Sequence, residues 1–563
     1  MVQVAHSMRA ILLYAASIIV LPVTEAQLYD SVIQTSYGPV QGYKYFDNTT
    51  LSTYFNSTPP TNNNVAAFLG IPYAASTGYQ NRWKAPQPRE PWNSTLQADT
   101  FGPACPQSAR DYPNDYSEDC LSLNIWTNAV SKDAGLPVLV WNQGSDESSN
   151  KTWWYGGGMA LKDVILVTFN RRDDAFGYLA HPELNAEGLA STGHNTSGNY
   201  GILDHLEVLK WVQSNIGEFG GDKEKVTVAG QSFGSAQAYH AVNSPLFKGY
   251  FRGAIAQSGI RYPYDTLVAG LATSYINMST AISFGLNYTA THNVSSIAEL
   301  RTLSMDQLIV GSSDRVDNST YSWVTALSTG YPLKFKPVLD GYVIPSSYIY
   351  ELLNGPANDV PVITGNTRDE SGASTMTNYT VAQYESYTSA KYGNLTSRYE
   401  SLYPAGGNST SASASWNSAA RDTSLVSSWA FARDWVTKSP AKSPFYTYYW
   451  DHAPPGQSQG AFHQSEIMYV LNSLYANADQ YPYTSYDYYL GEVMSNYWAN
   501  FVKTLDPNGG NSSSAGAVPA QWMPNDGEKE TVMQVGDGFG AMEIADEEKV
   551  DLLMDYFAQQ TPF

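Results

Sequence analysis

Cysteine is nearly absent from this chain of 563 residues, which contains only Cys105 and Cys120. The eight histidines are scattered, and they form no cluster with the spacing that zinc ligands require. We therefore expect no structural metal. No motif in the sequence indicates a cofactor either.

Positive charge is also scarce. Lysine and arginine together number 31, against 52 aspartates and glutamates, which gives a formal net charge of −21 at pH 7. A polyanion would be repelled, so the charge excludes nucleic acid as a partner. We interpret the acidity as a means of keeping the protein soluble, in preference to steering of cationic substrates.

Long apolar runs are missing, except near the N-terminus. Residues 10–23 are apolar, follow Arg9 and precede a Thr-Glu-Ala sequence that ends at Ala26. This pattern is typical of a secretory signal peptide, residues 1–26, cleaved after Ala26. The run is short for a membrane span, and the C-terminus carries no lipid-anchor or retention signal. We expect a secreted, extracellular protein without a stable membrane anchor.

Two further features are consistent with secretion. A lone pair of cysteines in a secreted chain is expected to form one disulfide that closes a short loop. Asn-x-Ser/Thr sequons mark surface positions if they carry glycans. They occur at Asn48, Asn56, Asn93, Asn150, Asn195, Asn277, Asn287, Asn293, Asn318, Asn378, Asn394, Asn408 and Asn511.

No internal repeat or long linker divides the chain. The low-complexity stretches 406–415 and 508–520 are interpreted as exposed loops within a domain. We expect one large domain, residues 27–563, and find no pattern that indicates an oligomeric state.

Residues 226–234 carry the strongest functional motif. An apolar, β-branched run leads into Gly-Gln-Ser-Phe-Gly at 230–234, and a helix-like segment follows. A sharp strand-to-helix turn of this kind lifts the serine oxygen above the sheet edge. Ser232 is therefore a candidate nucleophile for acyl transfer, in particular ester hydrolysis. The same pattern at 456–460 follows two prolines and no strand, so we interpret it as a loop.

A serine nucleophile needs a base, and the base needs an acid to orient it. Among the histidines, His452 and His463 remain once those in helical or other loop patterns are set aside, and His463 stands in a loop just ahead of an apolar helix. The acid is expected between the serine and the histidine. Residues 362–372 offer a strand that ends in a polar turn with Asp369 and Glu370, and spacing does not choose between them.

The chain resembles the type-B carboxylesterase family, which includes cholinesterases and fungal lipases. Matching blocks cover nearly the whole mature chain in order, at residues 70–74, 117–126, 198–204, 215–222, 256–259 and 501–507, together with the acid turn and the histidine loop. The resemblance implies the α/β-hydrolase fold, with a large, mostly parallel central sheet flanked by helices.

By the same resemblance Ser232 is the nucleophile, His463 the general base and Glu370 the acid that holds the imidazole. The pair Cys105–Cys120 matches the family's first disulfide. Ser258 matches a buried serine that supports the acid in relatives, or has a structural role.

Two departures from the family fall on the expected oxyanion site. Relatives carry successive glycines after the strand at 137–141, whereas this chain places Gly144, Ser145 and Asp146 there, with the donor positions at Ser145 and Asp146. A carboxylate at Asp146 would repel an oxyanion unless it is paired or points away. The second departure is Phe233, whose amide can donate and whose ring is expected to crowd the acyl side or shield the oxyanion. Relatives commonly have a glutamate in place of the preceding glutamine.

Three functions follow from these residues. The first is hydrolysis of small-molecule or lipid carboxylic esters through an acyl-serine. The short loop between Cys105 and Cys120 lacks the tryptophan of choline-binding relatives, which disfavours choline esters. The second is a triad-dependent acyl transfer or tailoring reaction. The third is a non-catalytic binding protein, which is disfavoured because Ser232 is kept.

Overall fold

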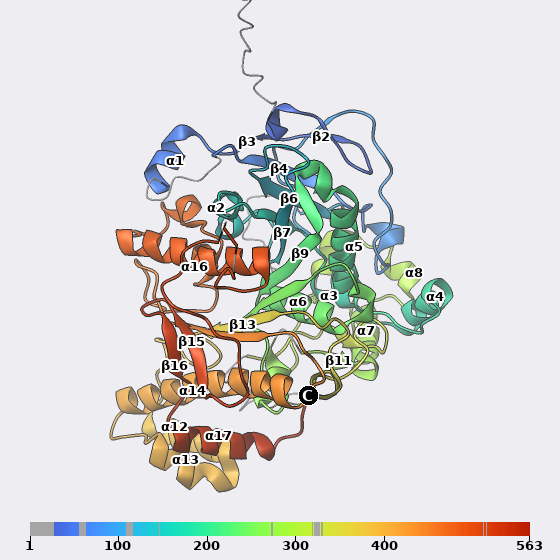
Figure 1. Ribbon diagram of the computed structural model, residues 1–563. Coiled ribbons are helices and arrows are strands. Elements are labelled where there is room, and N and C mark those ends of the chain that lie inside the picture. The colour runs from blue at the N-terminus through green and yellow to red at the C-terminus, as the bar shows by residue number, and fades with distance from the viewer. Residues whose placement is uncertain are drawn as a thin grey trace, which may run out of the picture.

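An eleven-stranded sheet forms the centre of the computed structural model (Figure 1). The structure describes residues 27–55, 63–107, 116–145, 147–271, 274–317, 319, 322, 327, 330–510, 512–513 and 515–563. The expected signal peptide, Asp146, and the sequons at Asn56, Asn318 and Asn511 lie outside these residues.

The central strands run parallel and the edge strands antiparallel. All neighbouring pairs from β15 to β8 are parallel, whereas the pairs at both edges are antiparallel. The mostly parallel centre is as expected, and the sheet as a whole is mixed. In spatial order the strands are β16 (Gly540–Glu543), β15 (Thr531–Val535), β14 (Phe445–Trp450), β13 (Val362–Thr367), β10 (Gly253–Gln257), β9 (Gly221–Gln231), β7 (Leu136–Asn142), β8 (Ile165–Phe169), β6 (Ser122–Thr127), β4 (Ala66–Pro72) and β3 (Tyr43–Lys44).

The remaining elements surround this sheet. Two small sheets consist of β1 (Ile33–Gln34), β2 (Pro39–Gln41) and β5 (Leu96–Gln97), and of β11 (Ile276–Asn277) and β12 (Val338–Leu339). The helices are α1 (Asn48–Tyr54), α2 (Gly157–Ala160), α3 (Asp174–Tyr178), α4 (Pro182–Thr192), α5 (Tyr200–Asn215), α6 (Phe233–Asn243), α7 (Met278–Thr291), α8 (Ile297–Leu300), α9 (Met305–Ile309), α11 (Tyr348–Asn354), α12 (Val381–Tyr392), α13 (Thr396–Leu402), α14 (Ser409–Thr437), α15 (Ile467–Val470), α16 (Ser485–Thr504) and α17 (Glu547–Ala558).

Both faces of the sheet are buried, which explains why its central strands are apolar throughout instead of alternating. In β7, Val138 and Val140 join the core on the side of α5 and α6, whereas Leu139 and Trp141 join the core on the side of α15 and α16. Figure 1 shows α5 and α16 on opposite sides of the central strands. Helices therefore pack against both faces of the sheet and fix the positions of its strand ends.

The carboxyl ends of four neighbouring strands meet at one edge of the sheet. Asn142 at the end of β7 pairs with Gly230 of β9, and Gln231 pairs with Gln257 at the end of β10. The next strand, β13, ends at Thr367, just before the acid turn. Ligand sites of open α/β sheets lie at such carboxyl ends, so this edge is where the candidate residues converge.

The surface agrees with the expected positions of the sequons. Nine of the ten sequon asparagines within the described ranges are exposed, and Asn150 is half-buried.

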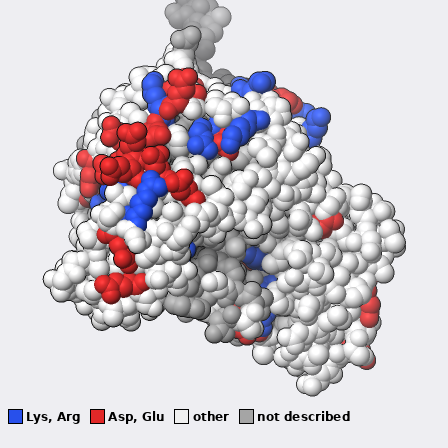
Figure 2. Space-filling view, turned by 90° about the horizontal axis from the view of Figure 1, so that it is seen from below, with Lys and Arg blue, Asp and Glu red and all other residues white. Residues whose placement is uncertain are grey.

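Acidic side chains gather on one part of the face drawn in Figure 2. In the described portion of the chain, no helix combines the length and apolar character needed to cross a bilayer.

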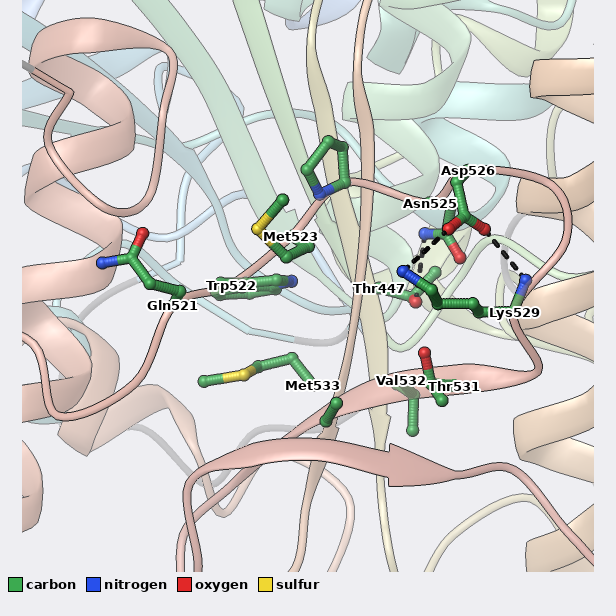
Figure 3. A pocket seen from close by; sticks show the side chains of 12 residues that line it. Thr447, Gln521, Trp522, Met523, Asn525, Asp526, Lys529, Thr531, Val532 and Met533 are labelled. Carbon is green, nitrogen blue, oxygen red and sulfur yellow. Dashed lines mark hydrogen bonds and ion pairs between the residues drawn. The ribbon is translucent and has the colours of Figure 1, made fainter.

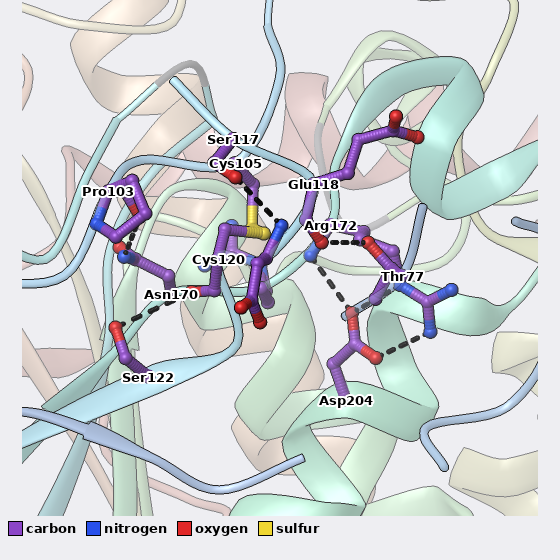
Figure 4. Close-up of a disulfide and its surroundings, with 12 residues drawn as sticks. Thr77, Pro103, Cys105, Ser117, Glu118, Cys120, Ser122, Asn170, Arg172 and Asp204 are labelled. Atoms are coloured by element: carbon purple, nitrogen blue, oxygen red, sulfur yellow. Dashed lines mark hydrogen bonds and ion pairs between the residues drawn. A yellow bond between two sulfur atoms is a disulfide. The ribbon is translucent and has the colours of Figure 1, made fainter. Parts of the chain in front are cut away.

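The structure joins Cys105 and Cys120 in a disulfide, as expected, with a Cα–Cα distance of 5.0 Å (Figure 4). Close by, Arg172 forms a bidentate ion pair with Asp204, at 2.6 Å and 2.9 Å, and both side chains are buried. The disulfide therefore lies beside the segment that follows β8.

Replacing both cysteines with alanine is expected to lower the free energy of unfolding by about 3 kcal/mol, because the closed loop of this length no longer restricts the unfolded chain. Equilibrium denaturation of the wild type and the double variant measures the difference. A variant as stable as the wild type would show that the disulfide does not reduce the conformational entropy of the unfolded chain, which would contradict the expectation.

Candidate active site

Ser232 occupies a sharp turn between β9 and α6, as predicted. Its backbone has φ 57° and ψ −120°, a conformation that costs a non-glycine residue free energy and persists only when the surroundings enforce it. The flanking glycines provide the space. A Cβ on Gly230 would lie 2.4 Å from the carbonyl carbon of Gly234, and a Cβ on Gly234 would lie 2.0 Å from the carbonyl oxygen of Asn142. No larger residue fits either position without moving the backbone.

Glu370 and His463 form a hydrogen-bonded pair next to this turn. His463 Nδ1 lies 2.5 Å from Glu370 Oε2. The other carboxylate oxygen accepts a hydrogen bond of 2.9 Å from the Thr367 amide, and the carboxyl group is buried. The geometry therefore selects Glu370, and not Asp369, as the partner of the imidazole.

Asp369 has a different role, which explains why spacing alone left two carboxylates open. It forms ion pairs with Arg421 at 2.5 Å and with Arg368 at 3.0 Å. It also accepts a hydrogen bond of 2.8 Å from the amide of Ala461, two residues before His463. Asp369 thus holds the histidine loop against the acid turn.

The electrostatics of the pair favour the charged forms. Burial alone would raise the pKa of Glu370, but the hydrogen bond and charge of His463 lower it below its ordinary value. Burial alone would lower the pKa of His463, but Glu370 raises it above its ordinary value. The acid is therefore a carboxylate, and it stabilises the imidazolium that a general base forms.

The other histidines lie outside this arrangement. His205 on α5 and His240 on α6 are buried, and burial lowers the pKa of each to about 3. His452 lies between Asp537 and Asp487, at 2.6 Å and 3.1 Å. Of the two histidines left open by the sequence, His463 is the one paired with the acid turn. The second Gly-x-Ser-x-Gly, at 456–460, is a loop, as predicted.

The altered glycine loop lies against the nucleophile. A Cβ on Gly144 would lie 3.9 Å from the Cβ of Ser232, and Ser145 next to it is half-buried. The triple glycine at 156–158 packs elsewhere, because Cβ atoms there would meet Trp126, Phe46 and Asn472. Gly144 and Ser145, and not the triple glycine, therefore form the described part of the loop beside Ser232.

The ring of Phe233, which was expected to crowd the acyl side or shield the oxyanion, is buried. It is 3% exposed and packs edge-on against Tyr178, with ring centroids 5.5 Å apart. Its other neighbour is the guanidinium carbon of Arg171, 5.3 Å from the ring centroid. The core under α6 has room for the ring, so the side chain turns inward.

The chain matches a family model described as "Carboxylesterase family" over residues 29–552. The chain belongs to the carboxylesterase family. It is 33% identical to the fumonisin B1 esterase of Sphingopyxis macrogoltabida over 73% of this chain and 72% of that protein. It is 28% identical to the para-nitrobenzyl esterase of Bacillus subtilis (strain 168) over 85% of this chain and 90% of that protein. A solved PNB esterase structure matches with a TM-score of 0.69 and 25% identity, covering 93% of this chain and 99% of the other.

These comparisons confirm the predicted α/β-hydrolase fold, and they identify the protein as a carboxylic ester hydrolase. The departures from the family pattern stand out against this background, because they cluster around the nucleophile.

One departure, Gln231, lies against the candidate base. Its amide nitrogen is 3.3 Å from Nδ1 and 3.2 Å from Nε2 of His463. An atom about equally far from both ring nitrogens does not lie along the lone pair of either one. Among the described residues no hydrogen bond links Ser232 Oγ to His463, and the contact at Nε2 is with the Gln231 amide.

Sequence reasoning missed several residues that surround the loop beside Ser232. The Gln464 amide lies 3.1 Å from the Cβ position of Gly144 and 3.5 Å from Glu147 Oε1. Glu147 also pairs with Lys151 at 2.7 Å, and burial raises its pKa. The sequence offered one clue to each residue. Gln464 directly follows His463, and Glu147 directly follows Asp146, and both of these neighbours were candidate site residues.

Ser258 does not support the acid through a hydrogen bond. Its hydroxyl is buried and has no hydrogen-bond partner in the ranges that the structure describes. The buried carboxyl close to the pair is that of Glu466, one oxygen of which accepts a hydrogen bond of 2.9 Å from Gln257. Burial and the charge of Glu370 raise the pKa of Glu466 to about 7.

A separate pocket lies between the 521–529 loop and β15 (Figure 3). It is lined by Trp522, Met523 and Lys529 among others, and no candidate catalytic residue contributes to it. It is not part of the site around Ser232.

The raised pKa of Glu466 predicts a pH-dependent penalty on stability. A folded-state pKa of about 7 exceeds that of an unfolded glutamate, so the folded protein favours the protonated carboxyl group. The contribution of Glu466 to the free energy of unfolding is therefore complete at low pH and is lost as pH rises through about 7. Glu466→Gln is therefore expected to gain up to about 3 kcal/mol relative to wild type between pH 4 and pH 8. Denaturant unfolding across this range measures the gain. A difference that does not change with pH would contradict the expectation.

Gln231→Glu is expected to raise the pKa of His463 further, because a carboxylate beside the ring stabilises the imidazolium. A general base works only when neutral, so the acidic limb of the kcat/KM profile should move to higher pH. Hydrolysis of an aryl ester measured from pH 5 to pH 9 tests this. Gln464→Glu is a control for an added negative charge at a neighbouring position. If the acidic limb of the profile does not move in Gln231→Glu, the placement of the Gln231 amide beside His463 is wrong.

Proposed function

We propose that the protein is a secreted serine esterase that cleaves carboxylic esters through an acyl-serine intermediate. Ser232 is the nucleophile, His463 the general base and Glu370 the acid that orients the imidazole. The observation that carries this proposal is the 2.5 Å contact between Glu370 and His463 beside the strained turn of Ser232.

The proposed reaction has two halves. In the first, Ser232 Oγ attacks the ester carbonyl while His463 Nε2 takes the hydroxyl proton, and the imidazolium then gives this proton to the leaving alcohol. In the second, His463 takes a proton from water, hydroxide attacks the acyl group, and the proton returns to Ser232. Glu370 remains a carboxylate throughout, which its lowered pKa supports.

Movement within the site is part of this proposal. The hydrogen bond from Ser232 to His463 forms when the substrate binds, since catalytic hydrogen bonds are often long or absent before that. The exposed fraction of the His463 side chain is 43%, which supports the mobility that the imidazole needs.

The negative charge that develops on the carbonyl oxygen needs donors. We assign the amide of Phe233, at the first position of α6, and the amides of the altered loop, with Ser145 first among them. The positive end of the α6 dipole supports an anion at this place.

The substrate class follows from the family and from the site. The relatives are named as a fumonisin B1 esterase and a para-nitrobenzyl esterase. For this chain we propose a small-molecule or lipid ester. Trp154 is fully buried and Trp153 nearly so, and both rings belong to the core.

Secretion through cleavage of residues 1–26 belongs to the same proposal. It is supported by the disulfide, which persists in oxidising compartments, and by the exposure of most sequon asparagines.

Labelling with a fluorophosphonate tests the proposal, because only an activated serine reacts quickly with this reagent. We expect one adduct, located at Ser232 by mass spectrometry, and its loss in Ser232→Ala. His463→Ala should slow labelling at least 100-fold. Ser458→Ala is the matched control, because Ser458 stands in the same pentapeptide pattern without the turn.

Folded protein that is not labelled would overturn the hydrolase mechanism and favour a binding protein. Rapid labelling together with poor hydrolysis of simple aryl esters would favour acyl transfer to an acceptor other than water.

A further inference from the structure

Arg171 is a buried cation that lies between the two altered parts of the oxyanion site. It follows β8, and its side chain is 0% exposed. Nη2 donates a hydrogen bond of 3.2 Å to the carbonyl oxygen of Gly144. On its other side, the guanidinium carbon lies 5.3 Å from the ring centroid of Phe233. One side chain therefore contacts both segments to which oxyanion donors are assigned.

The contact with Gly144 determines where the next amide points. The carbonyl of Gly144 and the N–H of Ser145 belong to the same peptide unit, which is planar and trans, so the two groups point in opposite directions. A donor that holds the carbonyl on the Arg171 side therefore turns the Ser145 N–H away from Arg171. Gly144 itself lies against Ser232, with a Cβ position 3.9 Å from that of Ser232.

The contact also changes the strength of the amide as a donor. A charged donor on the carbonyl oxygen polarises the peptide unit, and hydrogen bonds in such a chain strengthen one another. Arg171 and Gly144 are both buried, so the effect is less screened than it would be in water. The peptide between Gly144 and Ser145 becomes a better donor to a negative charge.

Arg171 is paired with one carboxylate, and part of its guanidinium carries no hydrogen bond within the described residues. Its ion-pair partner is Asp173, with Nε and Oδ1 3.2 Å apart. Within the described residues Nη1 has no hydrogen-bond partner. His205, which packs nearby, stays neutral, because burial and the charge of Arg171 lower its pKa to about 3. A guanidinium in this position favours the build-up of negative charge at the loop beside Ser232.

We propose that Arg171 is a positioning residue for ester hydrolysis, which fixes and polarises the Gly144–Ser145 peptide as an oxyanion donor. Its hydrogen bond to the Gly144 carbonyl holds the loop in the conformation that successive glycines allow in relatives. The inference rests on the proposed acyl-serine mechanism, and it predicts that Arg171 acts on the transition state and not on the bound ester.

The test compares Arg171→Met and Arg171→Lys with the wild type, using an aryl ester for kcat and KM and an aryl trifluoromethyl ketone as a transition-state analogue. Arg171→Met removes the donor and the charge, so kcat and analogue affinity should both fall about 10- to 100-fold with KM changed less than about two-fold. Arg171→Lys keeps a cationic donor and should recover part of both losses.

Arg82→Met is the matched control. Arg82 is also buried, pairs with Glu118 at 2.6 Å and donates to the carbonyls of Arg301 and Leu303, but it does not contact the loop beside Ser232. Its loss should lower the thermal midpoint and leave kcat and analogue affinity at the wild-type values.

Two results would overturn the proposal. One is an unchanged kcat and analogue affinity in both Arg171 variants. The other is an equal loss of substrate and analogue binding, which would show a role in the ground state. Failure of the serine mechanism itself is distinguishable, because the wild type would then neither take up fluorophosphonate nor bind the ketone. If Arg171→Met does not fold, Arg171→Lys alone decides between these results through its analogue affinity relative to its KM.

Discussion

The contact between the Ser232 turn and the end of β7 is the constraint on which the rest of the site depends. Gly234 approaches the carbonyl oxygen of Asn142 so closely that a Cβ there would lie 2.0 Å away. Because β7 and β9 are paired in parallel, with Asn142 opposite Gly230, the loop that follows Asn142 must leave the sheet beside the nucleophile. Sheet register and backbone packing thus bring Ser232 and the loop proposed to hold the oxyanion together, before any side chain contributes.

Charged side chains surround this backbone framework at two places. At the sheet edge, Glu370 faces His463, and Asp369 ties the histidine loop to the acid turn through the Ala461 amide. On the side of β8, a buried arginine faces the oxyanion loop, where relatives depend on glycine. The neutral form of His205 fits this arrangement, because a second cation beside Arg171 would be repelled. In the proposed mechanism, the hydrogen bond from Arg171 to the Gly144 carbonyl orients the loop in place of the missing glycines.

The resemblance to the carboxylesterase family predicted the fold, which the structure confirms. Local patterns predicted the sharp turn at Ser232, because an apolar strand precedes Gly-x-Ser-x-Gly, and the loop position of His463, which stands before an apolar helix. Spacing did not choose between Asp369 and Glu370, since neighbouring residues at a turn point in directions that spacing does not encode. The inward turn of the Phe233 ring depends on room beside Tyr178, a property of tertiary packing. Arg171 was overlooked for a related reason. Charged residues after β8 resemble an ordinary solvated loop, and only the strand order places them beside Gly144.

A crystal structure of the protein with a trifluoromethyl ketone bound tests the central claim most directly, because such an adduct holds the oxyanion in place. The account predicts a covalent bond from Ser232 Oγ to the ketone carbon. It also predicts an oxyanion within about 3 Å of the Phe233 and Ser145 amides, with Arg171 still bonded to the Gly144 carbonyl. An adduct whose oxygen points away from the loop beside Ser232, or a Gly144 carbonyl released from Arg171 and turned toward the oxyanion, would contradict it.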